Sequence, residues 1–414
     1  MPYVSFVRDN ARWLAGAFLL TFFSSYGQTF FISLSAGDIR AEYGLSHGEF
    51  GLVYMLATLA SAFTLPYLGQ IVDRRSPRQV TLLIVPVLAL GCVVMALAQH
   101  LAVLLAALYL LRLFGQGMMS QNAFTAVGRW FAAQRGKATS IAAIGLNAGE
   151  ALFPLLFVLV VGLVGWRNAW LVAAATLMVL ALPVISRLVA LEREPGDGDA
   201  ASPASGARDW TRAEVLRDPL FYLTMAGVMA PPFIGTTIFF HQVHLVELRG
   251  WSLEAFAASF TLMAGAVVVC SLIAGQLVDR FSARAMLPFF LVPLGLACLT
   301  LGFGEAQASA FVFMALLGLS YGLSSTMFSA LWPEVYGLAH LGAIRAMTVA
   351  IAVFATAAGP GLTGFLIDGG IAFPAQVVVM GIYCLVLCFV MVVVSRRLKA
   401  RALQPAWASA TGTP

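Results

Sequence analysis

Apolar positions in this chain come in runs about twenty residues long, separated by short polar segments. A run of that length lets an α-helix cross about 30 Å of hydrocarbon. The strands of a membrane barrel would instead alternate polar and apolar positions over about ten residues, and the chain lacks that alternation. The pattern therefore predicts an all-α polytopic membrane protein with twelve spans, at residues 12–34, 50–72, 79–98, 101–127, 138–164, 167–189, 219–243, 255–278, 284–303, 308–330, 344–367 and 371–395.

Composition supports a lipid environment. Of the 414 residues, 60% are hydrophobic and 10% are charged, whereas a soluble domain carries about 25% charged residues. The first apolar run continues into Gln28 and Thr29 without a small-residue cleavage site, so we expect a span there and not a cleaved signal peptide. All five cysteines fall within apolar runs and are predicted to serve packing, not a disulfide or metal framework. We expect no cofactor and no metal.

Polar segments predict the domain organisation and the orientation. The longest of them, 190–218, is rich in Gly, Ala, Ser, Pro and Asp and is predicted to be a flexible linker that ends in a short surface helix. It divides the chain into a six-helix half (1–189), the linker (190–218), a second six-helix half (219–400) and a tail (401–414). With both termini cytoplasmic, inner segments hold 20 Lys and Arg against 3 in outer loops, which predicts that orientation.

The two halves repeat one another. A ten-residue stretch reads GQIVDRRSPR from Gly69 and GQLVDRFSAR from Gly275, with seven identical letters and a separation of 206 residues. Each copy lies between two apolar runs, where it predicts a short charged turn. Three further pairs lie 208 or 210 residues apart and support a two-fold repeat: Gly27 with Gly235, Arg135 with Arg345, and Gly149 with Gly359.

Both copies of the stretch resemble the loop between helices 2 and 3 of the major facilitator superfamily, written G-x-x-x-D-R-x-G-R. They depart from it at Ser76 or Pro77 and at Ser282 or Ala283, where that family prefers glycine. The resemblance implies two parallel six-helix repeats with a cavity between them near the membrane midplane.

The same resemblance implies a cytoplasmic latch that opens during transport. A carboxylate such as Asp73 would meet a helix N-terminus or a basic side chain. A solvated turn that only fixes topology is the alternative; we favour the latch for the first copy and leave both interpretations open for the second. The predicted gate residues are Gly69, Asp73, Arg74, Arg78, Gly275, Asp279, Arg280, Arg284, Arg129, Arg135 and Arg345.

A second resemblance concerns the fifth span and its surroundings. Residues 129–170 contain RWF, RGKA, G-x-x-x-G, FP and GWR elements similar to the monocarboxylate and oxalate/formate porter branch and its bacterial relatives. That branch places an acid and an arginine where this chain has Val267 and Ser271, so its substrate class does not carry over directly. Residues 358–364 (AGPGLTG) resemble a drug-antiporter motif that belongs on the fifth span; close packing and a Pro360 kink are predicted for them here.

Two charged residues lie deep within spans. At 1.5 Å per residue, Arg112 falls about 16 Å below the outer start of the fourth span and Glu150 about 18 Å above the inner start of the fifth. Such groups are costly, by about 2.5–3.5 kcal/mol on insertion scales, and usually mark a pathway or relay. Glu150 is predicted to carry a proton, and Arg112 to stabilise its ionised form or to bind an anionic substrate. A permanent ion pair that fixes packing is the alternative.

Uncharged polar residues within the spans are candidates for the cavity lining, although each serves equally well as an interhelical hydrogen bond. These are Tyr26, Gln28, Thr29, Gln116, Gln121, Asn122, Asn147, Thr236, Thr237, Tyr321 and Ser324. His241 and His244, which end the seventh span, are interpreted as exposed loop residues in preference to pH sensors.

The sequence favours a transporter over other classes. RGKAT at Arg135 lacks the glycine and the Ser or Thr of a phosphate-binding loop, and no metalloprotease or catalytic-triad motif appears, so we expect no enzyme. The predicted function is proton-coupled transport of a small organic anion, with proton-antiport efflux of an amphipathic compound as the runner-up and a non-transporting sensor third. Expected partners are the solute, protons and the lipid bilayer of a bacterial inner membrane, with no nucleic acid and a monomeric chain.

Overall fold

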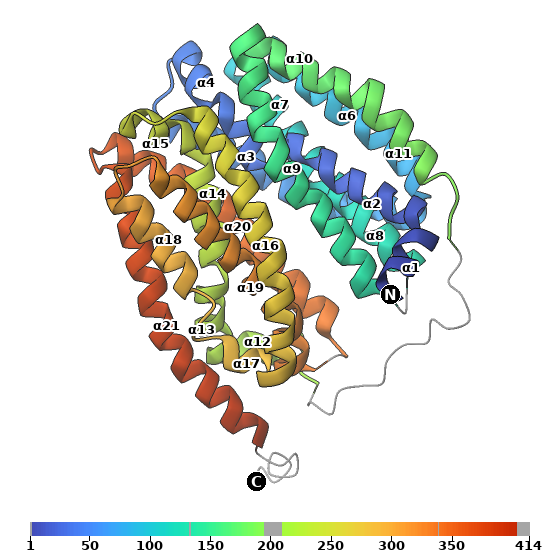
Figure 1. Ribbon diagram of the computed structural model, residues 1–414, viewed down its shortest axis with the longest axis vertical. Helices are drawn as coiled ribbons and strands as arrows, with labels where there is room; N and C mark the ends of the chain where they lie inside the picture. Colours follow the sequence, from blue (N-terminus) through green and yellow to red (C-terminus); the bar gives the residue numbers. More distant parts are fainter. Residues whose placement is uncertain (1, 132–133, 194–208, 338, 404–414) are drawn as a thin grey trace. The chain divides into compact units, whose positions relative to one another are not determined.

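The regular elements of the chain are helices. The computed structural model describes residues 2–131, 134–193, 209–337 and 339–403, and no strand occurs within these ranges (Figure 1). Ten of the described helices are long and apolar enough to cross a membrane, and a bent pair near the N-terminus brings the number to eleven. The prediction of an all-α polytopic membrane protein is confirmed.

Internal contacts divide the chain into two compact units. Unit 1 contains Met1–Ser202, Phe239–Thr261 and Pro360–Gly370. Its complete elements are α1 (Pro2–Asp9), α2 (Ala11–Phe23), the 3₁₀ turn η1 (Ser24–Gly27), α3 (Thr29–Ile32), the 3₁₀ turn η2 (Ser33–Ser35), α4 (Ala36–Tyr43), α5 (His47–Arg74), α6 (Pro77–Leu97), α7 (Leu101–Leu110), the π-helical η3 (Leu111–Met119), α8 (Ser120–Trp130), α9 (Arg135–Val164), α10 (Trp166–Thr176), the π-helical η4 (Leu177–Ala181), α11 (Leu182–Leu188) and α15 (Gln242–Arg249).

Unit 2 contains the remaining segments, Pro203–Ile238, Leu262–Gly359 and Ile371–Pro414. Its complete helices are α12 (Arg212–Arg217), α13 (Pro219–Val228), α17 (Ala283–Met286), α18 (Val292–Phe303), α19 (Ala308–Tyr336) and α21 (Phe373–Leu403). Three helices run from one unit into the other: α14 (Ala230–Phe240), α16 (Leu253–Phe281) and α20 (Leu341–Asp368). The predicted boundaries between halves, linker and tail remain predictions; residues 194–208 and 404–414 lie outside the described ranges.

The first span is broken near its middle. Ala11–Gly27 and Thr29–Tyr43 meet at 44°, and the backbone of Gln28 between them is extended, with φ −84° and ψ 153°. Ser24 donates a side-chain hydrogen bond of 2.6 Å to the carbonyl of Thr21, a local bond of the kind that competes with regular helix geometry. At the break, Gly27 packs so closely against the backbone of Gly115 that any side chain at either position would collide with it.

The expected ninth span, 284–303, is interrupted. Only α17 and the twelve-residue α18 are helical, and residues 287–291 between them form turns. Pro288 and Pro293 lack the N–H group that would continue the hydrogen bonds of an α-helix. The turn is closed instead by hydrogen bonds that span three residues, such as Phe289 N to Met286 O at 3.0 Å. An apolar run predicts a span by its length, but these prolines decide whether one continuous helix forms.

Glycines bring the fifth span onto the first. A side chain at Gly145 would collide with the Phe18 carbonyl, and one at Gly149 would collide with the Ser25 hydroxyl. In unit 2, Gly359 of α20 meets the Thr237 hydroxyl in the same way. Small residues at helix contacts in lipid allow this close approach, so the same device occurs in both repeats.

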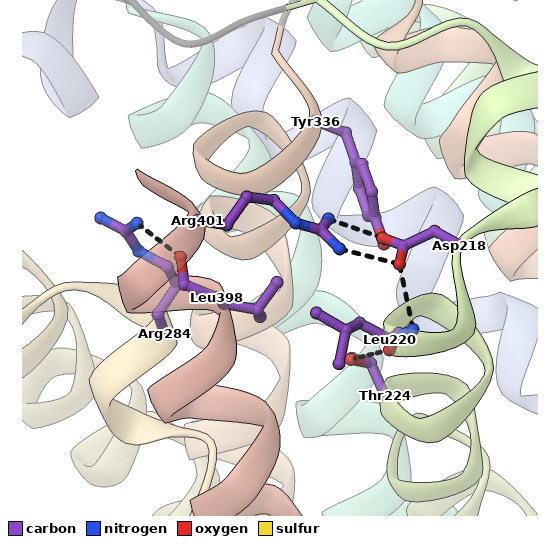
Figure 2. Close-up of polar contacts among 7 residues, drawn as sticks. All are labelled: Asp218, Leu220, Thr224, Arg284, Tyr336, Leu398 and Arg401. Carbon is purple, nitrogen blue, oxygen red and sulfur yellow. Dashed lines mark hydrogen bonds and ion pairs between the residues drawn. The ribbon is translucent and has the colours of Figure 1, made fainter. Parts of the chain in front are cut away.

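A polar cluster ties the end of the linker to three helices of unit 2. Asp218 is 4% exposed and accepts hydrogen bonds from both terminal nitrogens of Arg401, at 2.7 and 2.9 Å. Tyr336 donates its hydroxyl at 3.0 Å and Leu220 its backbone N–H at 3.1 Å, so the carboxylate also caps α13 (Figure 2). Trp210 covers Arg401 at 4.9 Å. The cluster anchors α12, whose existence was predicted.

Candidate functional site

The first copy of the repeated loop joins α5 to α6. Ser76 and Gln79 form a capping box that begins α6, and Ser76 has φ −67°, so the glycine preferred by the family is not needed there. Arg129 of α8 donates to the carbonyls of Val72 (2.7 Å) and Arg75 (3.3 Å), which end α5. Its guanidinium also lies 3.8 Å from the Asp73 carboxylate. The contact between Asp73 and Arg129 that sequence reasoning considered therefore exists, although it is long and exposed.

The second copy, between α16 and α17, is built differently. Ser282 has φ +79° and ψ 153°, and it is the one non-glycine residue with positive φ in the described ranges. This is a backbone region that favours glycine, which explains the preference of the family at this place. Arg284 pairs with Glu334 of α19, whose other carboxylate oxygen accepts from Ala283 N at 2.9 Å. Arg284 also points to the Leu398 carbonyl of α21 (Figure 2).

The remaining gate residues differ in their surroundings. A side chain at Gly69 would collide with the amide of Gln121, whereas Gly275 has open space beside it. Arg345 donates to the Ser329 carbonyl at 2.7 Å. The side chain of Arg135 lies outside the described part of the structure. Six charged members of the set are exposed: Asp73, Arg74, Arg78, Asp279, Arg280 and Arg345.

Arg112 is buried at the break in the first span. It lies in the π-helical η3, a form that often marks functional sites, and is 3% exposed. One terminal nitrogen donates to Thr29 Oγ1 at 3.2 Å and reaches the Gly27 carbonyl at 3.4 Å, and the guanidinium stands 5.4 Å from the ring centre of Tyr54. Its Nε is buried without a hydrogen bond. Within the described ranges, no carboxylate forms an ion pair with it.

Glu150 occupies the middle of α9, next to Gly149, and its side chain is partly exposed. No hydrogen bond or ion pair joins it to Arg112 among the described residues. The pairing inferred from depth is therefore not formed here, and a shared role for the two residues stays a prediction. Among the described residues neither Arg112 nor Glu150 forms an ion pair, and the alternative of a pair that fixes packing stays open.

The cavity candidates divide into two groups. Thr29 is buried and bonded to the Tyr54 hydroxyl at 2.6 Å, and Asn122 is buried and donates to Thr81 Oγ1 at 3.1 Å. Asn122 thus serves as an interhelical hydrogen bond. The other buried candidates are Tyr26, Thr237 and Ser324, and the partly exposed candidates are Gln28, Gln116, Gln121, Asn147, Thr236 and Tyr321.

Tyr54 was not anticipated. It is fully buried, bonds Thr29 and packs 4.8 Å from the ring of Phe240. Its only sequence signal is a hydroxyl within an apolar run. The interpretation of His241 as an exposed loop residue is wrong, because it is 3% exposed and its Nε2 lies 3.1 Å from the Pro360 carbonyl. Close packing of the α20 segment, at Gly361 and Gly364, is observed as expected.

Comparison with known proteins identifies a family and relatives for this chain. A family model described as Major Facilitator Superfamily matches residues 17–354. The chain is 27% identical over 293 residues to a probable sulfoacetate transporter of Cupriavidus necator, covering 66% of this chain and 65% of that protein. It is 29% identical over 220 residues to an MFS-type efflux pump of Mycolicibacterium smegmatis, covering 49% and 48%. The matches thus span less than two thirds of these relatives.

A solved structure agrees in fold. A bacterial homologue of the human lysosomal transporter Spinster, crystallised inward-facing and unoccupied, superposes with a TM-score of 0.71 at 16% identity. The superposition covers 98% of this chain and 100% of the other. The relatives and this structural neighbour are transporters, not enzymes.

Proposed function

Because the chain belongs to the Major Facilitator Superfamily, we propose that it is a secondary transporter that moves a small organic anion, such as a monocarboxylate, by alternating access and together with protons. The observation that carries this proposal is the buried guanidinium of Arg112. Charge buried in a membrane is costly unless it is neutralised or hydrated. The guanidinium of Arg112 contacts the Thr29 hydroxyl, the Gly27 carbonyl and the ring of Tyr54, and none of these groups carries a negative charge.

A carboxylate solute would supply the missing charge. Guanidinium binds carboxylates through paired hydrogen bonds, and the Nε of Arg112 is a donor that remains unused. The probable sulfoacetate transporter among the relatives is consistent with this chemistry, since sulfoacetate is a small organic anion. Thr29 and Tyr54 would then orient the guanidinium toward the solute.

Glu150 is the proposed proton site. It is the one acid well within a span, and its side chain is partly exposed. When it is protonated, the pathway retains the positive charge of Arg112 and attracts the anion. When it is ionised, it competes with the anion for that charge, which couples the two movements.

We place the protein as a monomer in the inner membrane of a bacterium, with both termini cytoplasmic, because Lys and Arg gather on that side. Asp73, Arg129 and the pair of Arg284 with Glu334 would then lie at the cytoplasmic ends of the helices. There they would act as the latch whose contacts change as the transporter switches.

Flux measurements in proteoliposomes test the proposal. Acetate, sulfoacetate, phosphate and a lipophilic cation are added outside while internal pH is recorded. We compare wild type with Arg112→Gln and Glu150→Gln, and use Arg8→Gln and Glu192→Gln as matched controls because both residues are exposed. Anion-evoked proton movement in wild type and the controls, lost in both test variants, is expected. Equal flux in Arg112→Gln would overturn the anion site, and coupled flux in Glu150→Gln would overturn the proton site.

Efflux of an amphipathic compound is the second candidate. A cavity of about 410 Å³ in unit 2 is lined almost wholly by apolar side chains, among them Phe233, Phe354 and Met380. Its volume lies in the range of small-molecule pockets, and one relative is an efflux pump. Proton movement evoked only by the lipophilic cation, and abolished by Phe354→Ala in this cavity, would favour this function over anion transport.

A further inference from the structure

A pocket lined by one arginine and three histidines lies in unit 1, remote in sequence from Arg112. It forms where α4, the start of α5 and the start of α15 meet. Its walls include Arg40, His47, His241 and His244, with Phe50 and Phe240 stacked beside them at 5.1 Å. Four of these six side chains are basic or imidazole groups, and no acid lines the pocket.

The imidazoles are held close together by backbone contacts. The ring centre of His47 lies 4.1 Å from that of His244 and 5.9 Å from that of His241. The Pro360 carbonyl only accepts, so the Nε2 of His241, 3.1 Å away, carries the hydrogen of that bond. Asp368 accepts the backbone N–H groups of His47 and Gly48 at 3.1 and 2.7 Å, which fixes the start of α5 against the end of α20.

Arg40 brings an unused hydrogen-bond donor to the pocket. The Nε of Arg40 is buried and makes no hydrogen bond, and no carboxylate in the described ranges lies within ion-pair distance of this guanidinium. Glu247 and Asp368 act on it only at longer range. Asp368 accepts two backbone N–H groups, and its negative charge acts on both Arg40 and His47.

We propose that this pocket is an anion-binding site, which takes one oxygen of a carboxylate or sulfonate head group onto Arg40 and gains a proton on His47 or His244 as it does so. The site would be a docking point for the solute on its way to or from Arg112, so this part rests on the proposed function. Its volume of about 10 Å³ is near the about 10–15 Å³ that one water requires, which admits a single oxygen. The rest of the solute would extend outward.

The electrostatics predict that anion binding is linked to protonation. Burial lowers the pKa of His241 from 6.5 to about 3, and repulsion from His47, His244 and Arg40 adds to this shift despite the bond to the Pro360 carbonyl. Burial and Arg40 likewise lower the pKa of His244. An anion beside these rings opposes the repulsion and moves their pKa values upward.

The affinity of the pocket for an anion should increase as pH decreases. Between the lowered histidine pKa of the empty pocket and the higher histidine pKa of the occupied pocket, the occupied pocket holds more protons, so anion affinity rises as pH falls through that window. For each proton taken up, the dissociation constant decreases by up to about tenfold per pH unit. The charged and titratable groups that face the pocket are Arg40, His47, His241, His244, Glu247 and Asp368.

Binding to the purified, full-length protein in nanodiscs tests the site. Titration calorimetry with acetate and with sulfoacetate is run between pH 5 and pH 8 on an Arg112→Gln background, which silences the other proposed anion site. Onto it are placed Arg40→Gln, Arg40→Lys and the double change of His47→Gln with His244→Gln. His100→Gln is the matched histidine control because His100 is exposed, and Arg8→Gln is the arginine control. Elution profiles confirm that each variant is folded.

We expect the background protein and both controls to bind the anion more tightly at pH 5.5 than at pH 7.5. Arg40→Gln should weaken binding at least tenfold, Arg40→Lys should restore part of it, and the double histidine variant should lose the pH dependence. Wild-type affinity and pH dependence in folded Arg40→Gln and double histidine variants would overturn the site. Loss of all binding in the Arg112→Gln background would also overturn the Arg40 site, while the proposed anion site at Arg112 would still stand.

Discussion

Removing the Asp218 carboxylate should destabilise the helices that it joins in unit 2 (Figure 2). Asp218→Ala deletes the N-cap of α13, worth about 1 kcal/mol, and leaves the buried Tyr336 hydroxyl without its acceptor, at about 1–3 kcal/mol. The Arg401 side chain is 30% exposed, so water can hydrate it again and its loss adds no more than about 1 kcal/mol. The free energy of unfolding should therefore decrease by about 2–5 kcal/mol.

Thermal unfolding of the purified protein measures this effect. For a unit of about 200 residues, each kcal/mol corresponds to roughly 2–4 °C, so the apparent midpoint should decrease by about 10 °C. Asp9→Ala is the control, because Asp9 forms only an exposed ion pair. In a double-mutant cycle with Arg401→Ala, the two changes should be less than additive by about 1 kcal/mol, the upper limit for this partly exposed pair. A midpoint within about 2 °C of wild type, or full additivity, would refute the reasoning.

The same carboxylate gives a pH test of defined sign. Burial raises the pKa of Asp218, but hydrogen bonds from Arg401 and from the Leu220 N–H outweigh it and bring the pKa below the usual 3.8. A depressed pKa stabilises the fold above the unfolded value and loses that contribution as pH falls through the folded value. The midpoint difference between wild type and Asp218→Ala should therefore be complete at pH 7 and shrink below about pH 4. A midpoint difference between wild type and Asp218→Ala that stays constant down to pH 3 would contradict this assignment of the Asp218 pKa.

Three further changes test the packing and the loops. Gly149→Leu should collide with the first span and lower the yield of folded protein, with a destabilisation of about 1–3 kcal/mol, whereas Gly162→Leu meets open space and should fold normally; equal elution profiles would contradict this. Replacement of Ser282 by glycine should relieve its positive φ and raise the unfolding midpoint by an amount equivalent to about 1 kcal/mol; a lower midpoint would argue against strain. Arg129→Gln should lower the unfolding midpoint more than Asp73→Asn. The reason is that Arg129 makes short hydrogen bonds to the carbonyls that end α5, whereas its ion pair with Asp73 is long and exposed. The opposite order would show that the ion pair contributes more than the hydrogen bonds.

The repeated loop shows how far a motif predicts structure. Both copies carry serine near the place where the family prefers glycine, and the letters alone suggest equivalent turns. Ser76 instead caps α6 with φ −67°, while Ser282 has φ +79°. The backbone angle depends on how the following helix begins. The first copy leads into the long, continuous helix α6, whereas the second leads into the short helix α17, which is followed by a turn. Local sequence predicts that a turn occurs, but neighbouring packing selects its geometry.

The intramembrane charges show the same division. Counting residues along two helices estimates depth from the rise per residue, and it assigned Arg112 and Glu150 similar depths. Which way each side chain faces depends on helix rotation, and the π-helical η3 alters rotation around Arg112. The break at Gln28 then presents Gly27 and Thr29 as the partners of this arginine. The partner cannot be read from depth alone.

The sequence by itself determined the membrane environment, the helical class, the family and the spans apart from the first and the ninth, which are broken, because apolar run length and loop motifs are local properties. Tertiary structure alone decided that Arg112 meets a hydroxyl, a carbonyl and Tyr54, and that Arg40 and three histidines share a pocket. Those contacts join segments up to about two hundred residues apart. The geometry of these contacts depends on how the first span bends at Gln28 and how closely helices approach at glycines. Both are set by packing between helices and not by any single apolar run of the sequence.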